Sequence, residues 1–136
     1  MKIGELASAT ATKVETVRYY EKIGLLALPA RTSANYRAYG NEHLARLSFI
    51  RRARDLGFTL EAVRELLTLS DDKARSCEAV DSIARVHLAD IERKISDLAA
   101  LRTELDRVIG SCRRGTVGDY KIIETLGPKD ARASVI

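Results

Sequence analysis

Small or apolar residues recur every three or four positions along the second half of the chain, which is the spacing of the contact line of a coiled coil. The repeat begins and ends at a cysteine, and only its step at Leu101 is out of phase. No proline interrupts it, and its first glycine is Gly110, so the pattern predicts one continuous helix. We call the repeating positions the seam: Cys77, Val80, Ala84, Leu88, Ile91, Ile95, Leu98, Leu101, Leu105, Ile109 and Cys112.

The two cysteines of the chain lie at opposite ends of the seam. At a rise of 1.5 Å per residue, the helix separates them by about 50 Å, so they cannot meet within one chain. An antiparallel register that places Cys77 opposite Cys112 of a second chain also pairs the other seam residues: Val80 with Ile109, Ala84 with Leu105, Leu88 with Leu101 and Ile91 with Leu98. This register predicts a symmetric homodimer with a thiol pair at each end. The alternative is that both cysteines are only small apolar seam residues.

Two short helices are expected at the start of the chain. Ile3–Ser8 has an amphipathic pattern, and Ala9–Ala11 is a tight connection. Thr12 followed by Glu15 is a capping box, which predicts a second helix that ends near Gly24. Helices joined by so few residues indicate a helix-turn-helix, whose second helix enters the major groove of DNA. Its exposed face is expected to carry Lys13, Thr16 and Arg18.

A polar stretch, PARTSANYRAYG, occupies residues 29–40. It is too short and too polar for a helix, and it predicts a two-stranded ribbon with Asn35 near its turn. Tyr36 and Arg37 are expected at the tip of this ribbon. A ribbon next to a helix-turn-helix is a wing, so the head is predicted to be a winged helix-turn-helix.

Two further helices are expected between the wing and the seam. Asn41 is placed to cap the first and Gly57 to stop it, while Thr59 is placed to cap the second. A polar hinge, Ser70–Ser76, then leads into the seam helix, and a short apolar turn at Tyr120–Leu126 follows that helix.

The positive charge of the chain is concentrated in its first half. Residues 1–70 carry 11 Lys and Arg against 7 Asp and Glu, whereas residues 71–136 carry 12 of each, so the head is suited to a polyanion. No apolar run approaches the roughly 18 residues of a membrane helix, and Met1–Thr10 lacks the apolar core of a signal peptide. We therefore expect a cytoplasmic protein with no membrane contact and with reduced thiols. An enzyme is disfavoured because no nucleophile pairs with a base and no glycine-rich phosphate loop occurs.

Several motifs together resemble the mercury-resistance-regulator (MerR) family of bacterial transcription factors over about residues 1–126: IGELASAT, ETVRYYEKIGLL, NYRAYG, HLARLSFIRRARDLGFTLEAVRELL and IIETL. The resemblance implies a mainly α fold, with a winged helix-turn-helix DNA-binding domain at residues 1–70. A hinge and a long antiparallel coiled-coil dimerisation helix follow at 71–112, and an effector-binding loop, a short helical turn and a tail at 113–136. It also implies a homodimer that binds promoter DNA and twists it when an effector binds, so that RNA polymerase can use the promoter.

The resemblance also implies which side chains contact DNA. They are Lys13, Arg18 and Tyr19 on the second helix, and Tyr36 and Arg37 on the wing. Lysine and arginine pair with phosphates or guanine edges, and tyrosine hydroxyls with phosphate oxygens. The alternative for each residue is a solvated charge or a packed aromatic ring, and we assign packing, on Leu6, to Tyr20 alone.

The effector implied by the resemblance is a metal ion bound by Cys77 and Cys112 of opposite protomers. Family members that sense monovalent copper, silver or gold have a hydroxyl residue in place of Cys77, so this chain is similar to the divalent sensors. It departs from them because Tyr120 stands where they have a third cysteine. Two thiolates satisfy Hg(II), whereas Zn(II), Cd(II), Pb(II) or Co(II) needs more ligands, for which Asp81 and Asp119 could supply oxygens.

Two functions therefore stay open for the thiols. The first is a metal-responsive transcription regulator. The second is a redox or electrophile sensor of the same family, in which the cysteines form a disulfide or an adduct. Reversible, stoichiometric metal binding to the reduced dimer distinguishes the first from the second.

Overall fold

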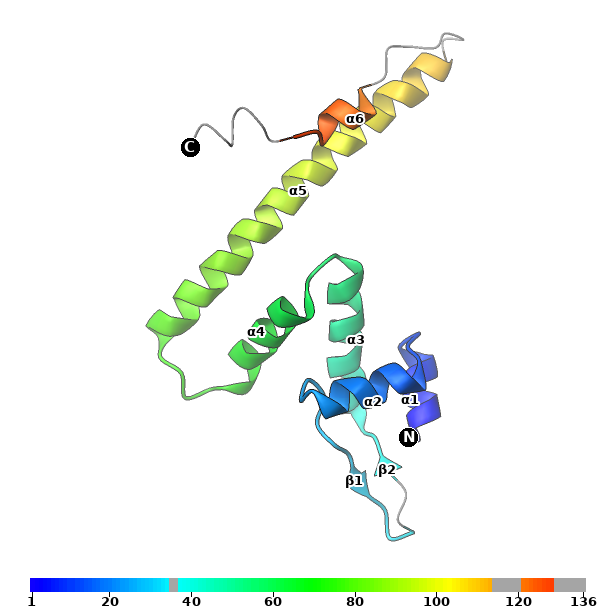
Figure 1. The fold of residues 1–136 in the computed structure, drawn as a ribbon, viewed down its shortest axis with the longest axis vertical. Coiled ribbons are helices and arrows are strands. Elements are labelled where there is room, and N and C mark those ends of the chain that lie inside the picture. The colour runs from blue at the N-terminus through cyan, green and yellow to red at the C-terminus, as the bar shows by residue number, and fades with distance from the viewer. Residues whose placement is uncertain (35–36, 114–120, 129–136) are drawn as a thin grey trace. The chain divides into compact units, whose positions relative to one another are not determined.

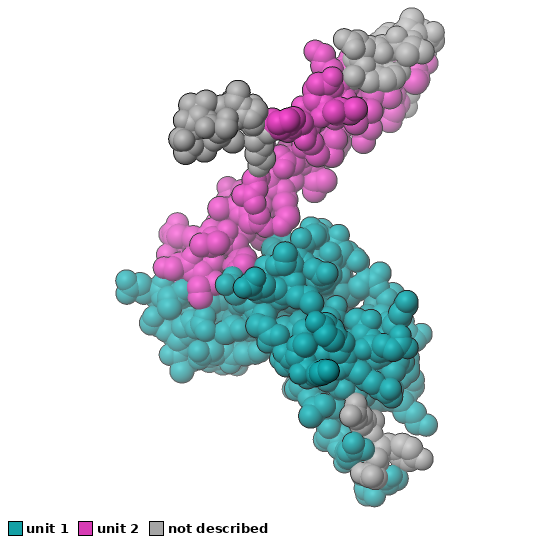
Figure 2. All heavy atoms as spheres, in the orientation of Figure 1, with its two compact units in different colours: residues 1–80 teal, residues 81–136 magenta. Residues whose placement is uncertain are grey.

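The structure is a computed structural model that describes residues 1–34, 37–113 and 121–128 (Figure 1). The chain divides into two compact units, residues 1–80 and 81–136, and the boundary between them falls inside the longest helix (Figure 2). The predicted mainly α fold is confirmed. In chain order the elements are α1 (Ile3–Ala9), α2 (Val14–Lys22), β1 (Ala30–Arg31), β2 (Arg37–Ala38), α3 (Asn41–Asp55), α4 (Leu60–Asp71), α5 (Cys77–Arg113) and α6 (Ile122–Thr125).

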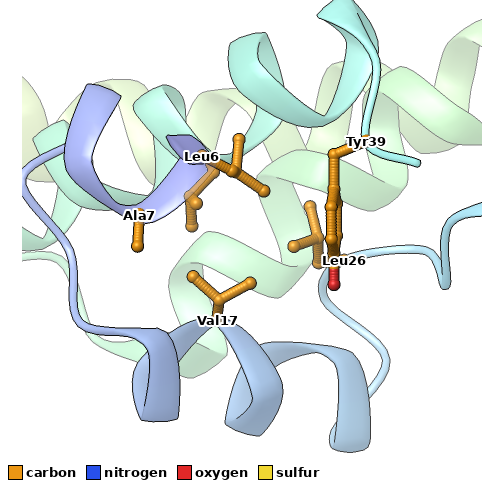
Figure 3. Close-up of a cluster of buried hydrophobic side chains, with 6 residues drawn as sticks. Leu6, Ala7, Val17, Leu26 and Tyr39 are labelled. Atoms are coloured by element: carbon orange, nitrogen blue, oxygen red, sulfur yellow. The ribbon is translucent and has the colours of Figure 1, made fainter. Parts of the chain in front are cut away.

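The core of the head lies where α1, α2 and α3 meet. Figure 3 shows Leu6 and Ala7 of α1 facing Val17 of α2. The buried cluster consists of Leu6, Ala7, Val17, Leu26, Tyr39 and Leu47. Fully burying one Leu or Val side chain contributes about 1.5–3 kcal/mol, so this cluster fixes α2 on α1. Tyr20 is partly buried against it, as predicted.

The turn between α1 and α2 differs from the prediction. Helix α2 begins at Val14 with Lys13 as its N-cap, and no side chain caps it. The Thr12 hydroxyl instead donates to the Thr10 carbonyl at 3.1 Å and accepts from the Thr10 hydroxyl at 3.0 Å. Thr12 is therefore not the cap, because its side chain is used to close the turn, a common competitor of capping. Within the turn, Ala11 has a φ of 52°.

The wing is a two-stranded antiparallel ribbon, as predicted. Strand β1 pairs with β2 so that Ala30 lies opposite Ala38 and Arg31 opposite Arg37. Arg37 is thus a paired residue of β2 and not a tip residue. The predicted turn at Asn35 and the predicted tip residue Tyr36 lie outside the described residues.

Helices α3 and α4 complete the head. The Thr59 hydroxyl caps α4 by accepting the N–H of Ala62 at 3.1 Å, which confirms the predicted cap. The N-cap of α3 is Gly40, one residue before the predicted Asn41. The boundary is shifted because Nδ1 of His43 accepts the Gly40 N–H at 3.1 Å. After α3, Gly57 adopts a φ of 93°, a backbone conformation that glycine reaches without strain.

Helix α5 runs through the whole predicted seam without a break and is 37 residues long. In the single chain its large seam side chains stay exposed: Leu88, Ile95, Leu98, Leu105 and Ile109 are between 47% and 62% exposed. An uncovered row of this kind is typical of a helix that packs against another one. Among the described residues, no helix is long and apolar enough to cross a bilayer.

Candidate nucleic-acid interface and thiol pair

The α2 residues predicted to contact DNA are accessible. Lys13 and Arg18 are exposed, Tyr19 is 49% exposed and Thr16 is half-buried. Each can therefore reach a ligand without a change in the packing of Val17 beneath them. On the wing, β2 includes Arg37, but its side chain and the whole of Tyr36 fall outside the described part of the chain.

A hollow of about 280 Å³ lies beside the start of α2. Its lining combines two cations with hydroxyl groups: Ala11, Thr12, Lys13, Thr16, Tyr20 and Arg51. Arg51 comes from α3 and donates to the Ala11 carbonyl and to the carboxylate of Asp55. Cations and hydroxyls near a helix N-terminus suit a phosphate oxygen. The sequence reading missed Arg51 because nothing local in the run RRARD indicates which arginine lies next to α2.

Two more arginines support the other end of α2. Arg64 of α4 donates to the Ile23 carbonyl at 2.6 Å, and Arg46 of α3 donates to the Leu25 carbonyl at 2.6 Å. Arg46 also forms a bidentate pair with Asp71 at 2.8 and 2.9 Å. The hydrogen bond from Arg46 lowers the pKa of the Asp71 carboxyl. Carbonyls at and just after a helix C-terminus lack helical partners, so these arginines hold the end of α2 against the helices behind it.

The two cysteines are placed as the seam pattern requires. Cys77 is the first residue of α5 and Cys112 the last but one, so about 50 Å of helix lies between them. Both belong to the described part of the chain, where both are exposed and neither forms a disulfide. A single chain therefore brings the α2 residues together but does not bring the two thiols together.

The predicted oxygen ligands are less complete. Asp81 lies one turn after Cys77, and its carboxylate accepts a 2.7 Å hydrogen bond from Nε of Arg85. This pair is exposed on both sides, so water or a cation can compete with the arginine. Asp119 and Tyr120 lie outside the described residues. Across residues 1–34, 37–113 and 121–128, no three His, Cys, Asp or Glu side chains are grouped closely enough to hold an ion.

The family follows from comparison with known proteins. Residues 1–69 match the family model "MerR HTH family regulatory protein", and residues 44–108 match "MerR, DNA binding". The chain belongs to the MerR family. MerR proteins are DNA-binding transcription regulators, so this MerR protein is a regulator and not an enzyme. Its winged helix-turn-helix head is the part that the first match covers.

Three similar proteins carry metals in their names. "Heavy metal-dependent transcription regulator 2" of Rhizobium meliloti (strain 1021) is 37% identical over 135 residues, which cover 99% of this chain and 92% of that protein. The "HTH-type transcriptional regulator ZntR homolog" of Haemophilus influenzae is 43% identical over 105 residues, or 77% of this chain and 78% of that one. The crystal structure of PbrR691 from Ralstonia metallidurans CH34 in complex with lead(II) is 40% identical, with a TM-score of 0.55, and the match covers 93% of this chain and 99% of that one.

Proposed function

We propose that this MerR protein is a metal-responsive transcription regulator that binds promoter DNA as a homodimer. In this proposal, a soft divalent ion binds between Cys77 of one protomer and Cys112 of the other. The observation that carries it is the position of the two exposed thiols at opposite ends of a helix with an uncovered apolar seam. The names of the similar proteins, which refer to heavy metals and to lead, support a metal effector.

The dimer follows from the seam. Two α5 helices packed antiparallel would cover the exposed row and place Cys77 of each chain beside Cys112 of the other. The arrangement is isologous, so both thiol pairs are equivalent. It would also hold two heads at a set separation, which suits two half-sites on a promoter.

The contact with DNA is assigned to α2 and the wing. Lys13, Thr16, Arg18 and Tyr19 would face the major groove and its phosphates, with Tyr36 and Arg37 of the wing on the adjacent backbone. A change at the ends of α5 would then alter the bend and twist of the DNA between the half-sites. RNA polymerase would respond to this change at the promoter.

The ion is limited by the ligands. Thiolates are soft donors, and a pair of them satisfies the near-linear coordination of Hg(II). Cd(II), Zn(II), Pb(II) or Co(II) would need further donors, for which Asp81 and Asp119 are the proposed oxygens. Asp81 would have to exchange its hydrogen bond with Arg85 for the metal. A metal titration of the reduced dimer would determine which ion binds.

Mixed dimers test the pairing of the thiols. Cys77→Ser and Cys112→Ser should each abolish the response to metal while DNA affinity stays nearly intact. In a heterodimer of these two variants, one end holds both serines and the other end both cysteines, so one site is restored. Co-expression of two inactive proteins should therefore restore part of the reporter response, and mixed dimers should bind about half the metal of the native dimer.

A control and a contrary result complete this test. Ser82→Ala, at an exposed position of α5, should leave the response unchanged. Mixed dimers that form but bind no ion would show that the ligands come from within one chain or that the cysteines are only seam residues. Cross-linking of the protomers by an oxidant on a non-reducing gel, without metal binding, would favour the thiol-switch function instead.

A further inference from the structure

Glu104 of α5 holds the point at which the chain returns to α5 after the Cys112 end. Its Oε2 accepts the backbone N–H of Lys121 at 2.8 Å. The same carboxylate accepts two hydrogen bonds from Arg107, at 3.1 Å from Nε and 2.7 Å from Nη2. Lys121 is the N-cap of α6, so a side chain of one helix caps the next helix across the fold.

The environment of Glu104 is unusual for a residue on an otherwise exposed helix. Glu104 is only 8% exposed, whereas the neighbouring seam residue Leu105 is 47% exposed. A buried carboxylate is stable only when its oxygens accept hydrogen bonds, and these are supplied by Arg107 and Lys121. The hydrogen bonds from Arg107 and from the Lys121 backbone lower the pKa of Glu104, so it carries its charge at neutral pH.

Helix α6 depends on this contact. It is four residues long, and no side chain of its own caps it. A helix of that length is not stable alone in water. The Glu104 carboxylate and the packing of α6 on α5 must therefore fix its start.

We infer that Glu104 is a positioning residue for the proposed thiol site at Cys112. This inference rests on the proposed metal-sensing function. Glu104 lies eight positions before Cys112, or about 12 Å along the helix. The segment between Arg113 and Lys121 is thus held to α5 at both ends: by the helix itself at Arg113 and by Glu104 at Lys121. Fixing both ends reduces the conformational entropy that the segment loses when an ion binds at Cys112.

Metal affinity of the reduced full-length protein tests this role. The readout is the thiolate-to-metal charge-transfer absorption of bound Cd(II), titrated against a competing chelator. Glu104→Gln keeps the shape but loses the charge, and Glu104→Ala loses the acceptor altogether. Loss of an interaction that orients a metal ligand weakens binding by about 10- to 100-fold, so we expect about tenfold for Glu104→Gln and more for Glu104→Ala. Glu92→Gln, at an exposed carboxylate of the same helix, should leave the affinity unchanged.

A second readout works without metal. Hydrogen exchange at the Lys121 amide should be slow in the native protein and in Glu92→Gln, and faster in both Glu104 variants. Faster exchange with unchanged Cd(II) affinity would show that Glu104 anchors α6 without positioning the thiol, and this result would overturn the inference. A native protein that binds no metal would overturn the proposed function, and with it the role of Glu104 in metal binding, while the amide exchange would still report whether the anchor exists.

Discussion

The hydroxyl of Tyr39 donates a 2.6 Å hydrogen bond to Oε2 of Glu21. Tyr39 directly follows β2, and Glu21 belongs to the last turn of α2, so this contact joins the base of the wing to the helix predicted to enter the major groove. The Tyr39 ring is buried in the cluster formed by α1 and α2 (Figure 3) and meets His43 edge-on at a centroid distance of 5.2 Å. The wing and α2 are therefore held in one orientation by a single side chain.

Tyr39→Phe should loosen the wing without removing the ring from the core. The variant loses a hydrogen bond to a carboxylate, so we expect the free energy of unfolding of the head to fall by about 1–2 kcal/mol. DNA affinity should fall several-fold, because the wing is less well oriented. Denaturant unfolding and DNA titration measure the two effects. Tyr20→Phe, which keeps a ring packed on the same cluster, is the control, and an equal effect of both changes would remove the special role of the Tyr39 hydroxyl.

Arg18→Ala should weaken DNA binding, because the exposed guanidinium on α2 is predicted to contact phosphate or a base edge. Loss of one phosphate contact lowers the slope of the logarithm of affinity against the logarithm of salt concentration by about one unit. Binding isotherms at several salt concentrations give this slope. Arg102→Ala, at an exposed arginine of α5, should leave both affinity and slope unchanged. The assignment fails if Arg18→Ala matches this control.

Leu88→Asp should separate the protomers. Leu88 is 52% exposed in the single chain, so the substitution should leave the fold of the chain intact. In the proposed dimer it faces Leu101 on both sides of the two-fold axis, so two unpaired carboxylates would be buried, each at a cost of several kcal/mol. Sedimentation should show monomers, with DNA binding lost and the head still folded. Ala89→Asp, one position off the seam, is the control; an intact Leu88→Asp dimer would rule out the proposed register.

Asp71→Asn should make the stability of the head less sensitive to acid. Arg46 lowers the pKa of Asp71 below its ordinary value of 3.8, so the ionised carboxyl stabilises the folded state at higher pH. This stabilisation is complete above about pH 4 to 5 and is lost as the pH falls through the lowered pKa. Because the side chain is 53% exposed, the contribution should lie within about 0.2–1 kcal/mol.

Unfolding in denaturant at pH 7 and near pH 3 measures this difference. The native protein should be the more stable of the two at pH 7, and the gap to Asp71→Asn should narrow in acid. Asp106→Asn, at an exposed carboxylate of α5, should show no such change. A gap that stays constant with pH would mean that the Arg46–Asp71 pair contributes nothing to the acid sensitivity.

The sequence predicted those parts of the fold that depend on local signals. The cap at Thr59, the positive φ at Gly57 and the unbroken α5 each follow from residues a few positions apart. The caps at Thr12 and Asn41 were wrong by one residue, in opposite directions. In each case another side-chain contact decided the boundary: the Thr10–Thr12 pair in the first and the side chain of His43 in the second.

Contacts between distant residues could not be predicted in this way. Arg51 reaches Ala11 across 40 positions, and Glu104 reaches Lys121 across 17. Nothing in the spacing of these residues signals the contact, because it depends on how the helices pack. The thiol pair could be inferred only because a regular repeat connects its two members. The ligands beyond the thiols have no such repeat, so their assignment stays a prediction.

The conformation of Ala11 restricts which related sequences can keep this head. A φ of 52° places this residue in the left-handed region, which costs an alanine roughly 1–2 kcal/mol and is easier for glycine and asparagine. A β-branched residue at this position would strain the turn further. In a library randomised at position 11, glycine and asparagine should therefore be enriched among folded variants, and valine and isoleucine depleted. The alanine in this chain marks a position where evolution has left stability unused.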